Sequence, residues 1–186
     1  NHTVREDLQD TMQKGSRVSV AGACFSIYAY QELKKQLEEI AELRFIFTSP
    51  TFVQENTPKE RREFYIPKLT REKSLYGTEF EVRLRNELTQ KALAKECADW
   101  VRRKVKFRSN VSGEQMPGFM TVGESSYMPI SGFTTVDLGC ERGNNAYYPV
   151  QRTEAFENGR YFLSLFDEIW NDSSRLQDVT DIVLQS

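Results

Sequence analysis

The sequence predicts a single-domain α/β protein. Three patterns indicate this class. Apolar, β-branched and aromatic runs at residues 17–28 and 43–47 enclose a helical pattern, which is typical of parallel strands joined by a right-handed crossover. A long helical pattern then leads into an alternating strand. Short apolar runs separated by glycine and proline follow over residues 109–152.

The first quarter of the chain is expected to contain a helix, a strand, a second helix and a second strand. Thr3 and Glu6 have the spacing of a capping box, and the short helix after them should end at Gly15. Residues 17–28 are predicted to form a buried strand, and residues 43–47 another. Between the two strands, apolar residues recur at helical spacing opposite a charged face; they are Leu33, Leu37 and Ile40.

Residues 48–75 differ from their surroundings and are expected to form an insertion. They contain three prolines, and residues 59–73 hold six basic and three acidic side chains. Proline is unfavourable inside helices and central strands, so regular structure is not expected here. Two interpretations stay open: a solvated loop, or an arm that contacts phosphate groups.

A long helix and an edge-like strand are predicted next. The helical pattern opens with a second capping box, and neither proline nor glycine interrupts it before Lys104. From Lys104 apolar and basic residues alternate, which indicates a strand. Val105 and Phe107 should therefore face the core, and Lys106 and Arg108 should point outward.

The C-terminal part is predicted to contain a β-meander and two helices. The meander covers residues 109–152, with residues 146–150 as its last strand. An amphipathic helix is expected around residues 162–169. Ser174 should cap a final helix that extends to Val183.

Composition limits the classes of protein that this chain can represent. Its 186 residues fit one domain, taken as residues 1–186, and its net charge of −2 gives no general attraction to nucleic acid or to anionic membranes. Any such affinity must come from a local patch. No apolar run is long enough to span a membrane, and the first residues lack the apolar core of a signal peptide. These features predict a cytoplasmic protein without membrane contact.

Several kinds of active site are also excluded. The only histidine is His2, so a catalytic Ser–His or Cys–His pair is not expected. The sequence has no glycine-rich phosphate loop, no His-Glu-x-x-His helix and no Cys-x-x-Cys pair. Cys24, Cys97 and Cys140 are widely spaced, and we interpret them as reduced core residues rather than as zinc ligands or disulfides. No cofactor and no metal are predicted.

One basic segment is a candidate nucleic-acid-binding site. Five of the seven residues from 102 to 108 are basic: Arg102, Arg103, Lys104, Lys106 and Arg108. Residues 78–108 hold nine basic and five acidic residues, a net charge of +4, whereas residues 154–186 hold two basic and seven acidic residues, a net charge of −5. A basic strand edge suits a phosphate backbone, because each neutralised phosphate releases counterions. The alternative is a solvated helix face and strand edge.

Residues 130–145 are a second candidate site. Small residues, hydroxyls, amides and Arg142 are concentrated there and could bind an anion, although turn formation explains the glycines and asparagines equally well. A further hypothesis is an enzyme of unrecognised type that uses Asp137, Glu141 or Arg142. It predicts a metal ion or phosphate near Asp137.

Five segments carry a resemblance to a known family. They are VSVAGACFS (18–26), LRFIF (43–47), ADWVRRKV (98–105), GFTTVDLG (132–139) and LFDEIWND (165–172). In this order they resemble the phospholipase D-like domain of bacterial helicases of the SNF2/DEAD-like type, including helicases carried by mobile conjugative elements of Gram-positive bacteria. The resemblance implies a phospholipase D-like mixed β-sheet that is flanked by helices on both faces. It also implies that this domain is the N-terminal region of a longer chain with an ATP-dependent helicase core.

The catalytic motif of that family is absent. Active members carry His-x-Lys followed by an aspartate; the histidine attacks phosphorus and the lysine steadies the phosphate oxygens. The matching strand here reads Gly118, Phe119, Met120, within residues 116–122, and a later family segment survives only as residues 131–134. The resemblance therefore implies the fold, without phospholipase or nuclease activity.

Two functions follow as expectations. The first is a non-catalytic module of a helicase-like protein that helps to bind DNA without sequence preference, with Arg142 and the five basic residues of the segment 102–108 as the contacts. The alternative is a protein-interaction or dimerisation module without nucleic-acid binding, because single-copy members of the family pair through their active-site face. The predicted partners are accordingly DNA, the helicase core of the parent chain, or a second copy of this chain.

Overall fold

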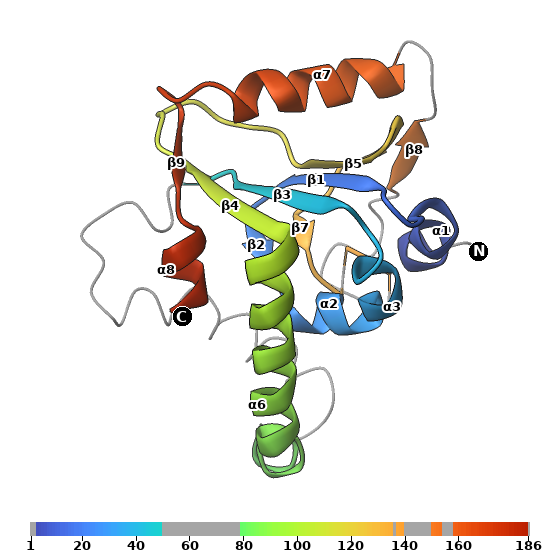
Figure 1. Cartoon of the computed structure of the whole chain (residues 1–186), viewed down its shortest axis with the longest axis vertical. Coiled ribbons are helices and arrows are strands. Elements are labelled where there is room, and N and C mark those ends of the chain that lie inside the picture. The colour runs from blue at the N-terminus through green and yellow to red at the C-terminus, as the bar shows by residue number, and fades with distance from the viewer. Residues whose placement is uncertain (1–2, 50–78, 136, 140–149, 154–157, 186) are drawn as a thin grey trace.

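A seven-stranded mixed sheet lies at the centre of the protein (Figure 1). The computed structural model describes residues 3–49, 79–135, 137–139, 150–153 and 158–185. The strand order is β8-β6-β5-β1-β3-β4-β9, and β2 and β7 pair in a separate small sheet. The strands are β1 Arg17–Gly22, β2 Cys24–Phe25, β3 Glu42–Phe47, β4 Val105–Asn110, β5 Phe119–Val122, β6 Ser125–Met128, β7 Gly132–Phe133, β8 Gln151–Thr153 and β9 Leu176–Asp178. The predicted α/β class is confirmed.

Three neighbouring strands of the sheet, β1, β3 and β4, run in the same direction. β1 pairs with β3 in parallel, as the strand–helix–strand pattern predicted, and β3 pairs with β4 in parallel. The outer pairings, from β1 to β5, β6 and β8 on one side and from β4 to β9 on the other, are antiparallel. The N-terminal ends of β1, β3 and β4 therefore lie along one edge of the sheet, which we call the N-terminal edge.

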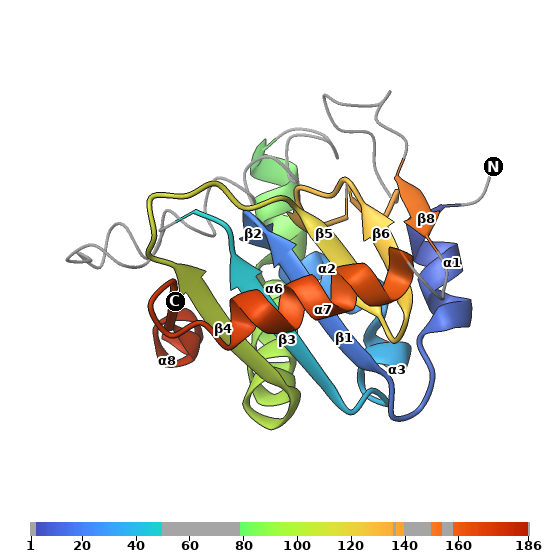
Figure 2. The same cartoon turned by 90° about the horizontal axis from the view of Figure 1, so that it is seen from above.

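Helices cover both faces of the sheet. α7 crosses the strands on one face, and the other helices pack on or beside the opposite face (Figure 2). We call these the α7 face and the α6 face. The helices are α1 Val4–Thr11, α2 Ile27–Glu32, α3 Lys34–Leu37, α6 Glu79–Lys104, α7 Asn158–Trp170 and α8 Thr180–Leu184. Among the described residues, none of these helices is long and apolar enough to cross a membrane.

Alternating side chains of the strands build a separate core on each face. On the α6 face, Phe45 and Phe107 contact Phe25, and Trp100 of α6 lies against Phe25 and Tyr30. The Trp100 ring is fully buried and donates a 2.9 Å hydrogen bond from Nε1 to the Leu37 carbonyl, so its one polar atom is satisfied. The α7 face holds a smaller cluster: Ala21, Ile46, Phe119, Phe166, Ile169, Trp170 and Leu176.

Local sequence signals account for several elements. Thr3 caps α1, because its Oγ1 accepts a hydrogen bond from the Glu6 amide at 3.2 Å. α6 runs without interruption to Lys104 and passes directly into β4, as predicted. Cys97 of this helix is buried, and burial raises the pKa of its thiol to about 12, which fits a reduced core residue.

The predicted strand over residues 17–28 is wrong in its second half. β1 ends at Gly22, and α2 begins at Ile27 after the two-residue strand β2. Ser26 explains the change, because its side chain accepts a hydrogen bond from the Tyr28 amide and caps α2. The helix expected around Leu33 is likewise two short helices, α2 and α3, separated at that residue.

Two expectations for the C-terminal part also need correction. Leu176 to Asp178 form β9 beside β4, where a helix capped by Ser174 was predicted, and the final helix α8 begins only at Thr180. Over residues 109–152, β5 and β6 do form a meander-like hairpin, but β7 leaves it to pair with β2. The helix around residues 162–169 is confirmed as α7. The insertion expected at 48–75, from residue 50 on, and residues 146–149 of the strand expected at 146–150 lie outside the described residues. Val150 is described and precedes β8.

Candidate functional site

The basic segment is divided between the two faces of the sheet. Its helical part, at the end of α6, lies on the α6 face. Lys106 and Arg108 alternate with the buried Val105 and Phe107, as predicted, and therefore lie on the α7 face. The prediction that both point outward holds for Lys106, which is exposed. The segment does not form one continuous basic surface; it wraps around the N-terminal edge.

The cations at the end of α6 already have partners in the protein. Arg102 forms an exposed 2.9 Å ion pair with Asp99, and Arg103 forms one at 2.8 Å with Glu38. Lys104 donates to the carbonyls of Glu38 and Ile40 at 2.6 and 2.7 Å, which fixes α6 to the turn before β3. Lys104 is thus a structural residue, while the heads of Arg102 and Arg103 remain more than half exposed.

Glu38 is the centre of this contact. Its carboxylate accepts hydrogen bonds from Arg103 and from the Tyr30 hydroxyl. Partial burial alone would raise the pKa of Glu38, but these hydrogen bonds, with the nearby charges of Arg103 and Lys104, lower it. The carboxylate is therefore charged at neutral pH, and it holds Arg103 against the turn.

The two basic residues of β4 have different surroundings. Lys106 is exposed, and within the part of the chain that the structure describes it forms no ion pair. Arg108 is half-buried beneath the end of α7, where its guanidinium lies 4.1 Å from the centre of the Trp170 ring and donates to the Trp170 carbonyl. Arg108 thus binds the C-terminal end of α7. It lies on the face opposite Phe107, as predicted, but α7 partly covers it, so it does not point into solvent.

Residues 130–145 can be described only in part, because Glu141 and Arg142 lie outside the described residues. Asp137 accepts hydrogen bonds from the Ser131 amide at 2.8 Å and from the Thr134 hydroxyl at 2.6 Å. These contacts close a turn, which fits the turn interpretation. No cluster of three or more metal-binding side chains occurs among the residues that the structure places.

A row of polar side chains on the α7 face is the main feature that the sequence patterns did not reveal. Its members occupy directly paired positions on five neighbouring strands, and we call them the polar row: Ser126, Thr121, Ser19, Arg44 and Lys106. The first four are buried. On β1, β3 and β5 the polar row is two residues away from an apolar residue that lies under α7; these apolar residues are Ala21, Ile46 and Phe119.

Arg44 is the charged member of the polar row inside the core. Only 5% of its surface is exposed. It forms a 2.7 Å ion pair with Asp167 of α7, donates a 2.9 Å hydrogen bond to the Ser19 hydroxyl, and lies over the rings of Phe166 and Trp170 at 4.8 and 5.6 Å from their centres. A single arginine inside the apolar run 43–47 was the sequence signal that could have identified it.

A pocket opens where the polar row meets the N-terminal edge. It has a volume of about 320 Å³ and lies between the C-terminal end of α7 and the starts of β1, β3 and β4. Its lining residues are Arg17, Glu42, Arg44, Lys106, Asp167, Trp170 and Asn171. Arg17 pairs with Glu42 at its rim, as Arg44 pairs with Asp167 inside it.

The opposite edge of the sheet is closed by backbone contacts. A Cβ atom on Gly118 would lie 1.9 Å from the Ile130 carbonyl oxygen, far closer than atoms can approach. Cβ atoms on Gly22 and Gly132 would likewise lie 2.5 Å from the Gly132 Cα and 2.2 Å from the Cys24 carbonyl oxygen. These glycines let three chain segments touch directly, so no side chain can project from those positions.

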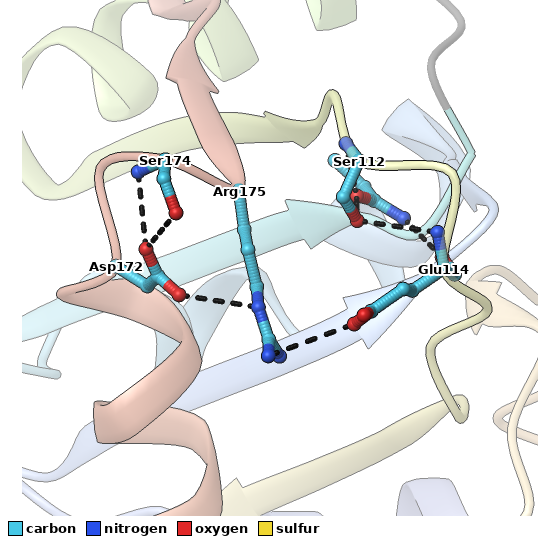
Figure 3. Close-up of polar contacts among 6 residues, drawn as sticks. Ser112, Glu114, Asp172, Ser174 and Arg175 are labelled. Atoms are coloured by element: carbon cyan, nitrogen blue, oxygen red, sulfur yellow. Dashed lines mark hydrogen bonds and ion pairs between the residues drawn. The ribbon is translucent and has the colours of Figure 1, made fainter.

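A set of polar contacts also joins the loops beside β9 at that end of the sheet (Figure 3). Arg175 lies 3.1 Å from Asp172 and 3.6 Å from Glu114. The Asp172 carboxylate accepts hydrogen bonds from the hydroxyl and the amide of Ser174, which lower its pKa. Each charged group of this cluster has a partner within it, and these contacts hold the loop after β4 to the loop before β9.

No model of a known protein family matches the chain, and no curated protein has a significantly similar sequence.

Proposed function

We propose that this chain is a non-catalytic phospholipase D-like module, the N-terminal part of a longer helicase-like protein, and that it contributes DNA binding without sequence preference. The observation that carries the DNA-binding role is the gathering of cations along the N-terminal edge. The resemblance in sequence supports the family and the parent protein, and the closed glycine positions support the absence of phospholipase chemistry.

The pairing of the strands brings these cations to one edge. Arg17 begins β1 and pairs with Glu42, the first residue of β3. Val105, the first residue of β4, pairs with Leu43, so the end of α6 lies beside the starts of both other strands. Arg17, Arg102, Arg103 and Lys106 therefore line one end of the sheet. A phosphate backbone that passed along this edge would meet cations from three segments.

The existing ion pairs do not prevent such contacts. Arg102, Arg103 and Arg17 each pair with a carboxylate at the surface, and more than half of each arginine side chain is exposed. Surface pairs of this kind contribute about 0 to 1 kcal/mol, so an arginine can exchange its carboxylate for a phosphate at little cost. Lys106 has no pair to break among the described residues.

Two positions support the proposal that this chain is a catalytically inactive member of the family. If Gly118 matches the family histidine, the contact with Ile130 leaves no room for a catalytic side chain there. If Met120 matches the family lysine, its side chain points to the α6 face and is 2% exposed, within the apolar core. A phosphate ester could reach neither position in the folded protein.

Charge reversal at the N-terminal edge tests the proposal. The variant R102E/K106E should bind a fluorescent 20-nucleotide single strand or duplex at least about tenfold more weakly than the unmodified protein, because it loses two phosphate contacts and adds repulsion. Arg103 is kept, because its ion pair with Glu38 joins α6 to the turn before β3, whereas Arg102 pairs with Asp99 inside the same helix. Fluorescence anisotropy at low salt measures the affinities.

The matched control is K91E/K95E, which changes the net charge equally at two exposed lysines of α6 that lie before its last two turns and form no ion pair among the described residues. It should weaken binding by less than about threefold, the part due to net charge alone. Equal losses in the two variants would contradict a site at this edge. A stable dimer that binds no DNA would instead favour the interaction module.

A further inference from the structure

The pocket beside α7 holds cations that the fold does not fully compensate. Arg44 and Lys106 are directly opposite each other on β3 and β4, and both lie on the α7 face. Like charges in opposite cross-strand positions repel and destabilise a sheet. The pocket lining carries three cationic and two anionic side chains, so one positive charge is in excess.

The internal ion pairs leave Lys106 as that excess charge. Arg17 is engaged by Glu42, and Arg44 by Asp167. Among the described residues, the buried Nε of Arg44 has no hydrogen-bond partner, although its other nitrogens bind Asp167 and Ser19; Oδ1 of Asp167 has only its ion pair with Arg44. A buried charged donor without a partner is unfavourable, so a negative ligand in the pocket would be stabilised by both strands.

We propose that this pocket binds a phosphate group, held by Lys106 and Arg17 at its mouth and by the field of Arg44 at its base. A phosphate accepts several hydrogen bonds at once, and this lining offers an ammonium, guanidinium groups and the Asn171 amide as donors. The volume of about 320 Å³ is sufficient for a phosphate or diphosphate group. Both carboxylates in the lining are already bound by arginines, so their charge is compensated before the ligand enters.

The phosphate has two possible sources, which share this chemistry. One is the DNA backbone, and for this source the inference rests on the proposed function. The other is a free phosphate or the diphosphate of a nucleotide, and for this source the inference does not depend on the proposed function. In either case the pocket adds Arg44, Arg17 and Asn171 to the contacts that the basic segment supplies.

The test measures binding of pyrophosphate and of a short oligothymidylate by calorimetry, in chloride buffer without phosphate. K106A removes the excess charge at an exposed position and should weaken binding of the occupying ligand at least about tenfold. K95A is the control, because Lys95 is an exposed lysine on α6 away from the pocket, and it should bind like the unmodified protein. Circular dichroism confirms that both variants fold.

The outcomes separate this inference from the DNA-binding proposal. Pyrophosphate binding that depends on Lys106, without any DNA binding, supports the pocket with a free phosphate as its ligand and contradicts the DNA role. Oligonucleotide binding that K106A leaves unchanged, with no pyrophosphate binding, overturns the pocket while the N-terminal edge remains a DNA site. The pocket is also overturned if neither probe binds, or if K106A and K95A bind both probes alike.

Discussion

Replacing Gly118 with alanine is expected to destabilise the protein by about 3 kcal/mol or more. The new Cβ would lie 1.9 Å from the Ile130 carbonyl oxygen. Because the obstacle is backbone, no flexible side chain can move aside, and the hydrogen bond from the Ile130 amide to the Gly118 carbonyl, 3.2 Å long, would break as the segments separate. Urea unfolding followed by circular dichroism measures the loss.

Gly113 provides the matched control for this substitution. A Cβ on Gly113 meets no atom within 4 Å, and the residue is exposed in the loop after β4. G113A should therefore change the free energy of unfolding by no more than about 0.5 kcal/mol. If G118A and G113A unfold at the same urea concentration, the close contact at Gly118 does not exist, and the argument that this position cannot hold a catalytic side chain is lost.

The second large effect is expected for D167A, which leaves Arg44 without its ion-pair partner. The Arg44 side chain is 6% exposed and the Asp167 side chain 41%, so the substitution strands the buried member of the pair. Removing one member of a buried pair costs about 3 to 5 kcal/mol. We expect about 2 to 3 kcal/mol here, because the adjoining pocket admits water to the guanidinium. The free energy of unfolding in urea again gives the value.

An exposed ion pair serves as the comparison for D167A. Asp99 pairs with Arg102 at a similar distance, but both side chains are more than half exposed. D99A should therefore cost less than about 0.5 kcal/mol. A D167A variant as stable as D99A would show that Asp167 is not what holds the Arg44 charge in the core.

Local patterns predicted the parts of the fold in which the local signals agree with one another. The strands at residues 17–22 and 43–47 are buried runs between helical segments, and their parallel pairing follows from the crossover between them. The passage from α6 into β4 is visible as a change of hydrophobic period from helical to alternating. In these segments propensity, burial and chain connection all favour the same structure.

The errors arose where tertiary contacts or a cap decided between two local structures. Residues 26–28 fit the end of a strand, but the Ser26 side chain caps α2 and starts the helix. Leu176 fits a helix face, yet pairing with Asn110 on the edge of the sheet makes the segment a strand. The capping hydroxyl was present in the sequence, whereas the free edge of β4 was not visible without the strand order.

The candidate site was likewise predictable only where it depends on a single strand. The alternation around Phe107 placed Lys106 correctly, because it depends on one strand only. The polar row depends on the register among five strands, which brings together residues up to 107 positions apart, such as Ser19 and Ser126. The sequence marks Arg44 as a charged residue within an apolar strand. It does not show that Ser19 and Lys106 of the neighbouring strands lie beside Arg44. The split of the basic segment likewise follows from the sheet lying between α6 and α7.

The most direct test of the central claim is the salt dependence of DNA binding by the unmodified protein. Affinity for single-stranded and duplex DNA of unrelated sequences is measured from about 20 to 300 mM potassium chloride, a range over which counterion release dominates binding to a phosphate backbone. The account predicts binding at low salt that is similar for all sequences and falls steeply, with a slope that corresponds to two or more phosphate contacts. Absence of binding at low salt, or affinity that does not change with salt, would contradict it.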